Sequence, residues 1–303
     1  MDTQRVPTMP SQRKPLVWVT GAGGLIGRYL LQSASRWAPD YKVQGLTRPE
    51  LDLTNRSALA TAFERQNPDV IIHCAALSRT KDCERDPDGA RRINVDATVH
   101  LEDLARDRPF LFVSSAEVFD GGKGWYDETD APAPINVYGV TKLAAEQVVL
   151  QNVRHSVVRI VLTAGTSLQH DRSFVEDMCR ATKAGSSITL YADEFRCPLP
   201  AGVIARAIWE LICGRRTGLY HLGGRERLSR WEIGQLLLEW FPELQGRLVK
   251  GSSRDHTGAP RPPDLSLSTT KIQQVLSFPI PGMQSWLGER RCRGDDLWDY
   301  PVP

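Results

Sequence analysis

Residue groupings that hold metals or disulfides are missing from this sequence. The six cysteines never form a CxxC pair, and the six histidines show no HxH or HExxH grouping. These absences argue against a zinc site and against a disulfide framework, because both are usually recognised by short, regular spacings of their ligands or partners. Free thiols suit a reducing compartment, so we expect a cytoplasmic protein without a bound metal.

Long apolar runs and a strong excess of charge are missing as well. No stretch approaches the roughly 18 apolar residues that span a bilayer, and the formal net charge is +2. We therefore expect neither a membrane nor a nucleic-acid partner. Residues 1–14 are polar, contain proline and lack the apolar core of a signal peptide, which is typical of a disordered lead-in.

The rest of the sequence alternates short apolar strands with longer helical segments. Strands are expected at 16–20, 41–47, 69–77, 109–115, 156–163 and 218–224. Helices are expected after the first strand and at 57–66, 87–106, 138–152, 171–185, 200–214 and 229–241. This alternation predicts an α/β, Rossmann-type doubly wound fold, in which helices cover both faces of a parallel sheet. Ligands of such sheets bind beyond the carboxyl ends of the strands.

The first strand ends in TGAGGLIG, which contains three glycines at G-x-x-G-x-x-G spacing. Gly21 permits a tight turn, Gly24 lets backbone N–H groups approach a pyrophosphate, and Gly27 lets the helix pack close to the strand. The N-terminus of the helix then faces the phosphate charge. Because the motif joins strand to helix, it predicts dinucleotide binding, with Leu25 and Ile26 in the same segment.

The tip of the second strand indicates which dinucleotide is bound. NAD-binding units usually place an acidic residue there, about 20 residues past the glycines. This chain has GLTRPE instead, with Arg48 and no acidic residue before Glu50. An arginine pairs with a 2′-phosphate through its planar guanidinium, so NADP(H) is favoured over NAD(H). Asp52 and Leu53 would border the adenine or, alternatively, cap the following helix.

Ser115, Tyr138 and Lys142 have the chemistry that carbonyl reduction requires. Ser115 ends a strand, and Tyr138 and Lys142 stand four residues apart, on one face of the expected helix. A tyrosine, with a pKa near 10, is a poor acid at neutral pH unless a nearby cation favours the phenolate. The lysine would supply that cation, and the serine hydroxyl would orient the substrate oxygen.

The order of motifs in this chain, TGAGGLIG, HCAA, INVDAT, FVSSAEVFDG and YGVTK, resembles the extended short-chain dehydrogenases/reductases. Within that superfamily, DETDAPAPINVYGVTKLAAE, DEFRCP and RPPDLSLSTTK look like segments of the dTDP-4-dehydrorhamnose reductase (RmlD-like) family. The resemblance spans about 16 to 290. It implies a dinucleotide-binding domain at 15–165, to which 200–224 returns, and a smaller C-terminal substrate-binding domain built from 166–199 and 225–303.

The resemblance also implies an activity, the NADPH-dependent reduction of a nucleotide-linked 4-keto-deoxysugar. The family's catalytic Ser/Thr, Tyr and Lys fall on Ser115, Tyr138 and Lys142, and its supporting asparagine falls on Asn94. Family members often pair through the helices at 87–106 and 138–152, which would give a homodimer, but the apolar periodicity of these helices fits a core face equally well.

Further positions are expected to contact the cofactor or the substrate. Cys74, Ala75 and Ala76 lie at the carboxyl end of the third strand and would line the cofactor site. Arg196 and Arg261 would contact the diphosphate of the substrate, or would form surface salt bridges instead.

The chain departs from the family pattern where the substrate would lie. The family has a Thr-Asp-Tyr run where this chain has Ser115, Ala116 and Glu117. The segment RIVLTAG also lacks the Trp and Tyr that follow the family's sixth strand. These departures concern the identity of the sugar rather than the reduction of its carbonyl group.

Two other functions stay open. In an NAD-dependent sugar-nucleotide epimerase or dehydratase, Glu117 would abstract a proton next to a carbonyl, although related dehydratases use an adjacent Asp–Glu pair and Ala116 removes half of it. A non-catalytic, dinucleotide-binding regulatory subunit is the other alternative. The regulatory subunit of methionine adenosyltransferase resembles this reductase family, so fold and glycine motif do not guarantee catalysis.

Overall fold

The computed structural model describes residues 13–167, 169–293 and 297. Most of the expected lead-in, residues 1–12, lies outside the described residues. So do residues 168, 294–296 and 298–303 of the expected substrate-binding domain.

A six-stranded sheet forms the centre of the molecule, and all its neighbouring strands run parallel. Its strands are β1 (Leu16–Thr20), β2 (Lys42–Leu46), β3 (Val70–His73), β4 (Phe110–Ser115), β5 (Ser156–Ile160) and β10 (Gly218–Leu222). They are arranged in the order β10-β5-β4-β3-β1-β2. The order reverses between β1 and β3, because the chain moves outward from β1 to β2 and then returns to the other side of β1. This is the topological switch point at which doubly wound sheets bind their ligands.

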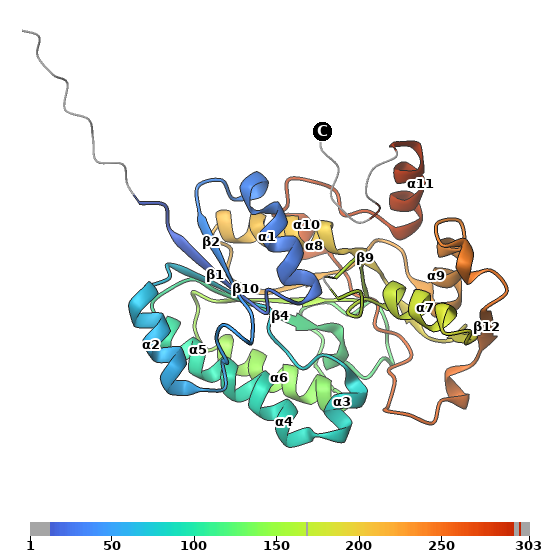
Figure 1. Ribbon diagram of the computed structural model, residues 1–303, viewed down its shortest axis with the longest axis horizontal. Coiled ribbons are helices and arrows are strands. Elements are labelled where there is room, and N and C mark those ends of the chain that lie inside the picture. The colour runs from blue at the N-terminus through green and yellow to red at the C-terminus, as the bar shows by residue number, and fades with distance from the viewer. Residues whose placement is uncertain (1–12, 168, 294–296, 298–303) are drawn as a thin grey trace, which may run out of the picture.

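Helices cover both faces of this sheet, as Figure 1 shows. One face carries α1 (Leu25–Trp37), α8 (Ala201–Cys213) and the short α10 (Thr270–Gln273). The other carries α2 (Arg56–Gln66), α3 (Thr80–Arg85), α4 (Pro87–Arg91), a π-helical turn η1 (Arg92–Asp96), α5 (Ala97–Ala105) and α6 (Val137–Val149). Apolar side chains alternate between the two layers: Leu111 and Val113 of β4 pack in the cluster with α1 and α8, and Phe110 and Phe112 pack in the cluster with α5 and α6.

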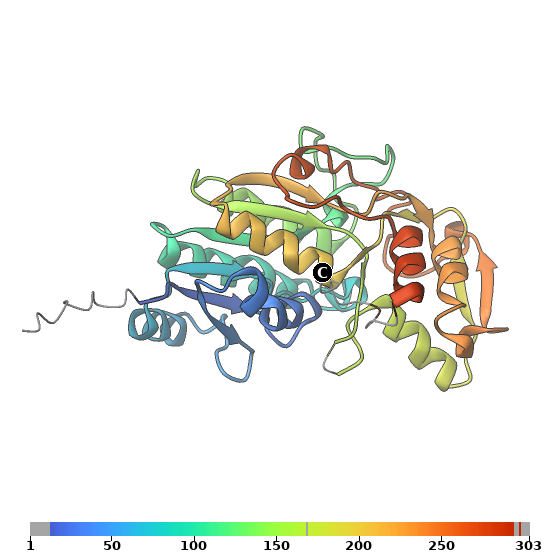
Figure 2. The ribbon, with the colours of Figure 1, turned by 90° about the horizontal axis from the view of Figure 1, so that it is seen from above.

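A smaller group of elements lies beside the sheet, at the right of Figure 2. Its helices are α7 (Phe174–Lys183), α9 (Arg230–Leu237) and α11 (Met283–Arg293). Its strand pairs are β7 (Ile188–Tyr191) with β12 (Leu248–Gly251), and β8 (Phe195–Arg196) with β11 (Leu228–Ser229). A third pair, β6 (Thr163–Ala164) with β9 (Leu199–Pro200), connects this region to the sheet, and short helical turns η2 (Ala116–Val118), η3 (Pro242–Leu244) and η4 (Ser253–Asp255) complete the structure.

The α/β, Rossmann-type fold with a smaller C-terminal region is confirmed. The strand expected at 69–77 ends at His73, so the CAAL segment is a loop at the sheet edge. The helix expected at 87–106 is interrupted by the π-helical turn η1. Among the described residues, no helix has the length and apolar character needed to cross a membrane.

Candidate functional site

The glycine turn after β1 lies against the loop after β3, at the switch point of the sheet. Gly21 has a positive φ of 68°. A Cβ atom at Gly21 would lie 2.7 Å from the backbone nitrogen of Ala75, too close for any other residue. At Gly27 a Cβ atom would overlap the carbonyl oxygen of Gly21. Both glycines therefore permit the close backbone approach that we expected, and they bring the β1 turn and the Cys74–Ala75 segment together.

The N-terminus of α1 is open to an anion. Gly24 precedes the helix, and no side chain caps its first N–H groups. The helices α2, α6, α7 and α9 differ, because Asn55, Asn136, Ser173 and Ser229 accept hydrogen bonds from their first turns. Uncapped N–H groups at a helix N-terminus bind phosphate, so the residues present fit a dinucleotide. The side chains of Leu25 and Ile26 are buried in the core, so only their backbone N–H groups are candidates for contact with a cofactor.

Arg48 is exposed at the tip of β2, and its side chain lies 3.7 Å from the carboxylate of Asp52. Asp52 also accepts hydrogen bonds from the backbone and hydroxyl of Thr54. The alternative that Asp52 or Leu53 caps the following helix is wrong, because Asn55 occupies that position. Arg48 is thus a cation held loosely at the strand tip, where a 2′-phosphate would compete with Asp52.

Ser115 and Tyr138 meet at the carboxyl end of β4. A hydrogen bond from Ser115 lowers the pKa of Tyr138, although burial and the nearby charge of Glu117 raise that pKa more strongly. The helix α6 is packed tightly here, because a Cβ atom at Gly139 would overlap the carbonyl oxygen of Glu117. The side chain of Asn136 caps this helix by accepting a hydrogen bond from Gly139. The cap and the close packing hold Tyr138 beside the strand end.

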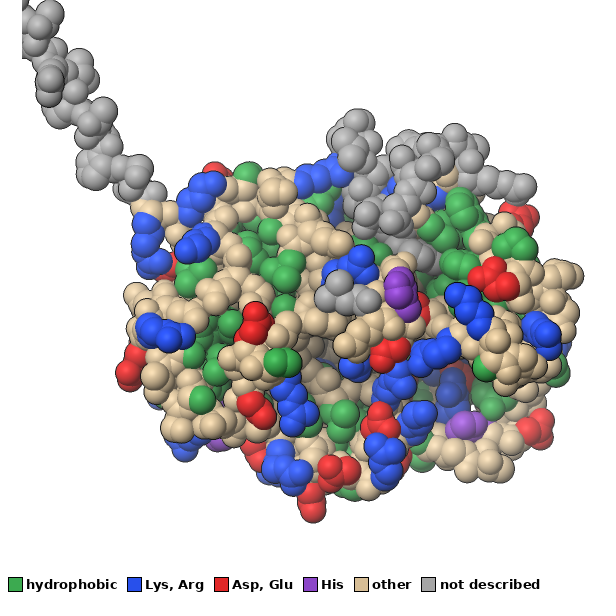
Figure 3. Space-filling view, viewed as in Figure 1, with side chains coloured by type: hydrophobic (Ala, Val, Ile, Leu, Met, Phe, Trp, Pro, Cys, Tyr) green, Lys and Arg blue, Asp and Glu red, His purple; other side chains and the backbone are tan. Residues whose placement is uncertain are grey.

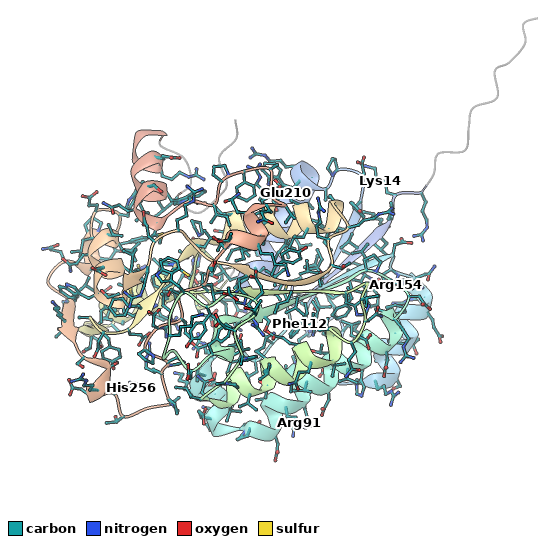
Figure 4. All side chains as sticks on the ribbon, turned by 180° about the vertical axis from the view of Figure 1, so that it is seen from behind. Lys14, Arg91, Phe112, Arg154, Glu210 and His256 are labelled. Carbon is teal, nitrogen blue, oxygen red and sulfur yellow. The ribbon has the colours of Figure 1, made fainter. Side chains whose placement is uncertain are left out.

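Lys142 is almost completely buried, one helical turn after Tyr138. Its Nζ donates a 2.7 Å hydrogen bond to the carbonyl oxygen of Val113 and lies 3.8 Å from the ring centre of Phe112. Phe112, labelled in Figure 4, lies between the sheet and α6. Burial lowers the pKa of Lys142 to about 7, while Glu146 and Cys74 raise it. Lys142 is therefore a desolvated cation at the end of β3 and β4.

Glu146 and Arg159 form a buried ion pair behind Lys142. The guanidinium of Arg159 donates to both carboxylate oxygens of Glu146, at 2.7–3.1 Å, and both side chains are at most 3% exposed. Arg159 also contacts Nε2 of His221 at 3.2 Å, and Nδ1 of His221 lies 2.9 Å from the carbonyl oxygen of Tyr126. This network ties α6 to β5, β10 and the loop that follows β4.

Asn94 lies in the π-helical turn and joins the β3 loop to α6. Its amide donates to the carbonyl of Leu77 and to Thr141 Oγ1, and its Oδ1 accepts from the backbone of Leu77. Thr141 in turn donates to the carbonyl oxygen of Tyr138. Turns of this kind often occur at functional sites, and this one aims an amide at the helix that carries Tyr138 and Lys142.

Glu117 extends the site toward the smaller region. Its carboxylate accepts a 2.8 Å hydrogen bond from the side chain of Asn136 and lies 3.9 Å from Arg196. Ala116 is buried and offers no functional group. Glu117 thus lies between Tyr138 and a group of arginines.

Those arginines converge on one buried carboxylate, Glu194. Arg261 binds it through two hydrogen bonds of 2.6 and 2.7 Å, and Arg196 approaches it to 3.1 Å. Arg196 also donates to the carbonyl oxygens of Phe195 and Pro262. The two arginines expected at the diphosphate therefore have protein partners. Sequence reasoning missed a third member of this group, Arg230, whose only sequence signal was its place directly after the predicted N-cap Ser229.

No group of three His, Cys, Asp or Glu side chains in the described part of the chain is arranged to hold a metal ion. The polar groups of the site are instead a serine, a tyrosine, a buried lysine, an asparagine and a cluster of arginines.

Comparisons with known proteins agree with this geometry. The family model described as RmlD substrate binding domain matches residues 15–290. A dTDP-4-dehydrorhamnose reductase from Aggregatibacter actinomycetemcomitans is 31% identical over 86% of this chain and 92% of its own length. The methionine adenosyltransferase 2 subunit beta of Pongo abelii is 30% identical over 88% of this chain and 83% of its own length.

A crystal structure of dTDP-4-dehydrorhamnose reductase from Bacillus anthracis in complex with NADP is also similar. It has a TM-score of 0.83 and 25% identity, covering 93% of this chain and 100% of that chain. By the extent of the family match and the identity to these relatives, the chain belongs to the RmlD substrate binding domain family of the extended short-chain dehydrogenase/reductase superfamily.

Proposed function

We propose that this protein reduces the carbonyl group of a nucleotide-linked keto-sugar with NADPH, in the manner of dTDP-4-dehydrorhamnose reductase. The observation that carries the proposal is the meeting of Ser115 and Tyr138 at the carboxyl end of β4, with the buried cation of Lys142 one turn away. Similarity to proteins named dTDP-4-dehydrorhamnose reductase supports a 4-keto-deoxysugar as the substrate class. We place this reaction in the cytoplasm.

Each residue has a separate task in this reaction. When bound, the reduced cofactor supplies a hydride to the carbonyl carbon. The hydroxyl of Ser115 donates a hydrogen bond to the carbonyl oxygen and orients it, and the phenol of Tyr138 delivers the proton that the developing alkoxide needs. Burial and the charge of Glu117 raise the pKa of Tyr138, so the phenol carries its proton in the free protein and gives it up to the alkoxide, which is the stronger base.

Lys142 and Asn94 support this step from behind. In the free protein the pKa of Tyr138 is raised, and Lys142 is not among the groups that shift it. We propose that Lys142 favours loss of the Tyr138 proton only in the complex with the cofactor, whose hydroxyl groups it can bind. In the free protein its ammonium is held by the Val113 carbonyl, within the Coulomb range of Cys74. Asn94 fixes the loop of Cys74, Ala75 and Ala76 relative to α6 through Leu77 and Thr141.

NADP(H) is the cofactor that we favour over NAD(H). Arg48 is an exposed cation at the tip of β2, and a 2′-phosphate would give it a stronger partner than Asp52. Gly21, Gly24 and Gly27, with the N–H groups of Leu25 and Ile26, would hold the pyrophosphate. Asp52 and Leu53 would border the adenine.

The two regions would divide the work. We propose that residues 15–165 with 200–224 bind the dinucleotide, and that 166–199 and 225–303 bind the sugar nucleotide, with Ala116 and Glu117 between them. A homodimer through the layer of α5 and α6 also remains our prediction. Val140 of α6 is an apolar residue left 52% exposed on that layer.

One observation favours a second candidate, an NAD-dependent epimerase or dehydratase. The carboxylate of Glu117 acts on Tyr138 and so lies close to the carbonyl position, where a base would abstract a proton. Its hydrogen bond with Asn136 and its proximity to Arg196 weigh against this role, because both carboxylate oxygens of Glu117 then already have partners in the protein.

Consumption of NADPH in the presence of a dTDP-4-keto-6-deoxysugar tests the proposal. We expect the absorbance of the reduced nicotinamide to fall only when both substrates are present, and faster with NADPH than with NADH. A protein that retains NAD through purification and converts the sugar without consuming NADPH would instead be an epimerase or dehydratase. Binding of NADPH without turnover of any keto-sugar nucleotide would favour a regulatory subunit.

A further inference from the structure

Arg230 is a largely buried cation whose guanidinium forms only a long ion pair, and no hydrogen bond, within the described part of the chain. It is the first residue of α9, and its side chain is 14% exposed. Its backbone N–H donates to the carbonyl oxygen of Glu194. Its guanidinium makes no hydrogen bond to any residue that the structure describes, and the nearest carboxylate oxygen, on Glu194, is 4.0 Å away. The ring of Phe174 lies 5.0 Å below it.

Glu194 offers Arg230 only a long ion pair of 4.0 Å, whose charge raises the pKa of Arg230 against burial, because the other arginines use the oxygens of Glu194 for closer contacts. Arg261 takes both oxygens in a two-pronged pair, and Arg196 approaches one of them to 3.1 Å. The pKa values of the two arginines differ accordingly. Burial lowers the pKa of Arg230 to about 10. The hydrogen bonds and charge of Glu194 outweigh burial at Arg261 and raise its pKa. Three guanidinium groups thus share one fully buried carboxylate.

Further carboxylates near this cluster do not complete the pairing. Glu117 lies 3.9 Å from Arg196, and Asp177 of α7 acts on Arg230 only through its more distant charge. A buried charge without a hydrogen-bonded partner costs folding free energy, so proteins rarely retain one without a use. The five N–H donors of a guanidinium suit a phosphate, which accepts two of them at once.

The location of Arg230 connects this weakly paired charge to the reaction site. Glu117 touches the arginine cluster through Arg196 and acts on Tyr138, so an anion bound at Arg230 would lie in the same region as the carbonyl position. Figure 3 shows Lys and Arg side chains gathered around a hollow on this face of the molecule.

We propose that Arg230 is the principal anion-binding residue of the smaller region and binds the diphosphate of a nucleotide-linked substrate. This inference rests on the proposed function. Glu194 is a positioning residue that holds Arg196 and Arg261 beside Arg230. These two arginines would compensate the second negative charge of the diphosphate. Arg196 and Arg261, which the sequence singled out, thus shape the site, and Arg230 binds the ligand.

Titration of the protein with dTDP and with inorganic pyrophosphate, at saturating NADPH, tests the assignment by calorimetry. Saturation with NADPH fills the phosphate site of the cofactor. Arg230→Met should weaken both ligands by about tenfold to a hundredfold, because a charge-assisted, two-pronged hydrogen bond is lost. The matched control Arg225→Met removes an exposed arginine five positions earlier and should change neither affinity.

Thermal unfolding of the ligand-free variants supplies a second reading. Because Arg230→Met removes a buried charge that has only a long ion pair, and keeps the apolar stem, we expect its Tm to equal or exceed that of the wild type. Glu194→Gln should behave oppositely, since it leaves three arginines facing one another, and should lower both Tm and dTDP affinity.

Unchanged dTDP and pyrophosphate affinity in Arg230→Met would overturn the assignment, as would a clear loss of Tm in that variant, which would make Arg230 a structural residue. Failure of the proposed function looks different. If no keto-sugar nucleotide is reduced but Arg230→Met still loses dTDP and pyrophosphate binding, the reductase proposal falls and the anion site stands.

Discussion

The two sides of the site treat their buried cations differently. At the sheet edge, Lys142 is hydrogen-bonded to Val113, and the Glu146–Arg159 pair behind it is fully satisfied within the protein. In the smaller region, the guanidinium of Arg230 has no hydrogen-bonded partner among the described residues and lies 4.0 Å from the carboxylate of Glu194. Under the proposed function, the sheet edge with Ser115, Tyr138 and Lys142 (the reaction side) is assembled before any ligand binds. The arginine cluster around Glu194 (the substrate side) would be completed by the ligand.

Among the variants considered, Tyr138→Phe should have the largest effect on catalysis. Removing the hydroxyl group removes the proton donor, so kcat should fall by about 10²- to 10⁴-fold, the usual contribution of a positioned acid. NADPH affinity should stay nearly unchanged, because the glycine turn and Arg48 are untouched. Steady-state kinetics and nicotinamide fluorescence measure the two quantities. Tyr41→Phe, remote from the sheet's carboxyl edge, is the matched control, and full activity in Tyr138→Phe would sink the mechanism.

Glu146→Gln tests whether the reaction side is held by its own ion pair. It leaves Arg159 buried without a counter-charge, which should lower the free energy of unfolding by about 3–5 kcal/mol. Denaturant unfolding measures this change. Glu64→Gln on the exposed face of α2 should have little effect. The double variant Glu146→Leu with Arg159→Met should recover most of the loss, and a loss that persisted there would mean that packing rather than charge is responsible.

The charge of Lys142 predicts a pH dependence of cofactor binding. Its pKa is lowered to about 7, so the ammonium form is complete below that pH and is lost as the pH rises through it. Affinity for NADPH and for NADH should therefore fall together, by about tenfold, on the alkaline side. NADH is the control because it lacks the 2′-phosphate, which titrates itself. Lys142→Met should bind both weakly at every pH; a retained pH dependence in that variant would assign the titration to another group.

Arg48→Ser should produce the smallest effect, because this arginine is exposed and its interactions are screened by solvent. We expect NADPH affinity to fall about fivefold, in line with the loss of about 1 kcal/mol, while NADH affinity stays the same. Fluorescence titration with both cofactors measures the ratio. Arg56→Ser, at the start of α2, controls for the loss of a surface charge. An equal loss for both cofactors would mean that Arg48 does not read the 2′-phosphate.

The placement of Ser115, Tyr138 and Lys142 near one strand end could be predicted from the sequence, because these residues lie in short, contiguous motifs. Gly21 and Gly27 indicate a close approach of backbone segments. The four-residue spacing of Tyr138 and Lys142 places both on one face of a single helix. The π-helical turn at Asn94 could not be predicted, since its sequence has the same apolar pattern as the α-helices on either side of it.

The substrate side could not be predicted in the same way. Arg196, Arg230 and Arg261 come from three separate segments, and only the fold reveals that they share one carboxylate. Sequence reasoning therefore chose Arg196 and Arg261 because they lie in recognisable motifs. It had no means of learning that Glu194 already holds both of them.

The fate of the cofactor's hydride tests the central claim most directly. The protein would be incubated with a dTDP-4-keto-6-deoxysugar and NADPH that carries deuterium at the hydride-donating position of its nicotinamide. The mass of the product would be measured by mass spectrometry. The reductase account predicts one deuterium in the sugar and one NADP formed for each product molecule. A product without deuterium would contradict this account. In a parallel reaction in heavy water with unlabelled NADPH, uptake of deuterium at the carbon next to the carbonyl, without consumption of NADPH, would also contradict it.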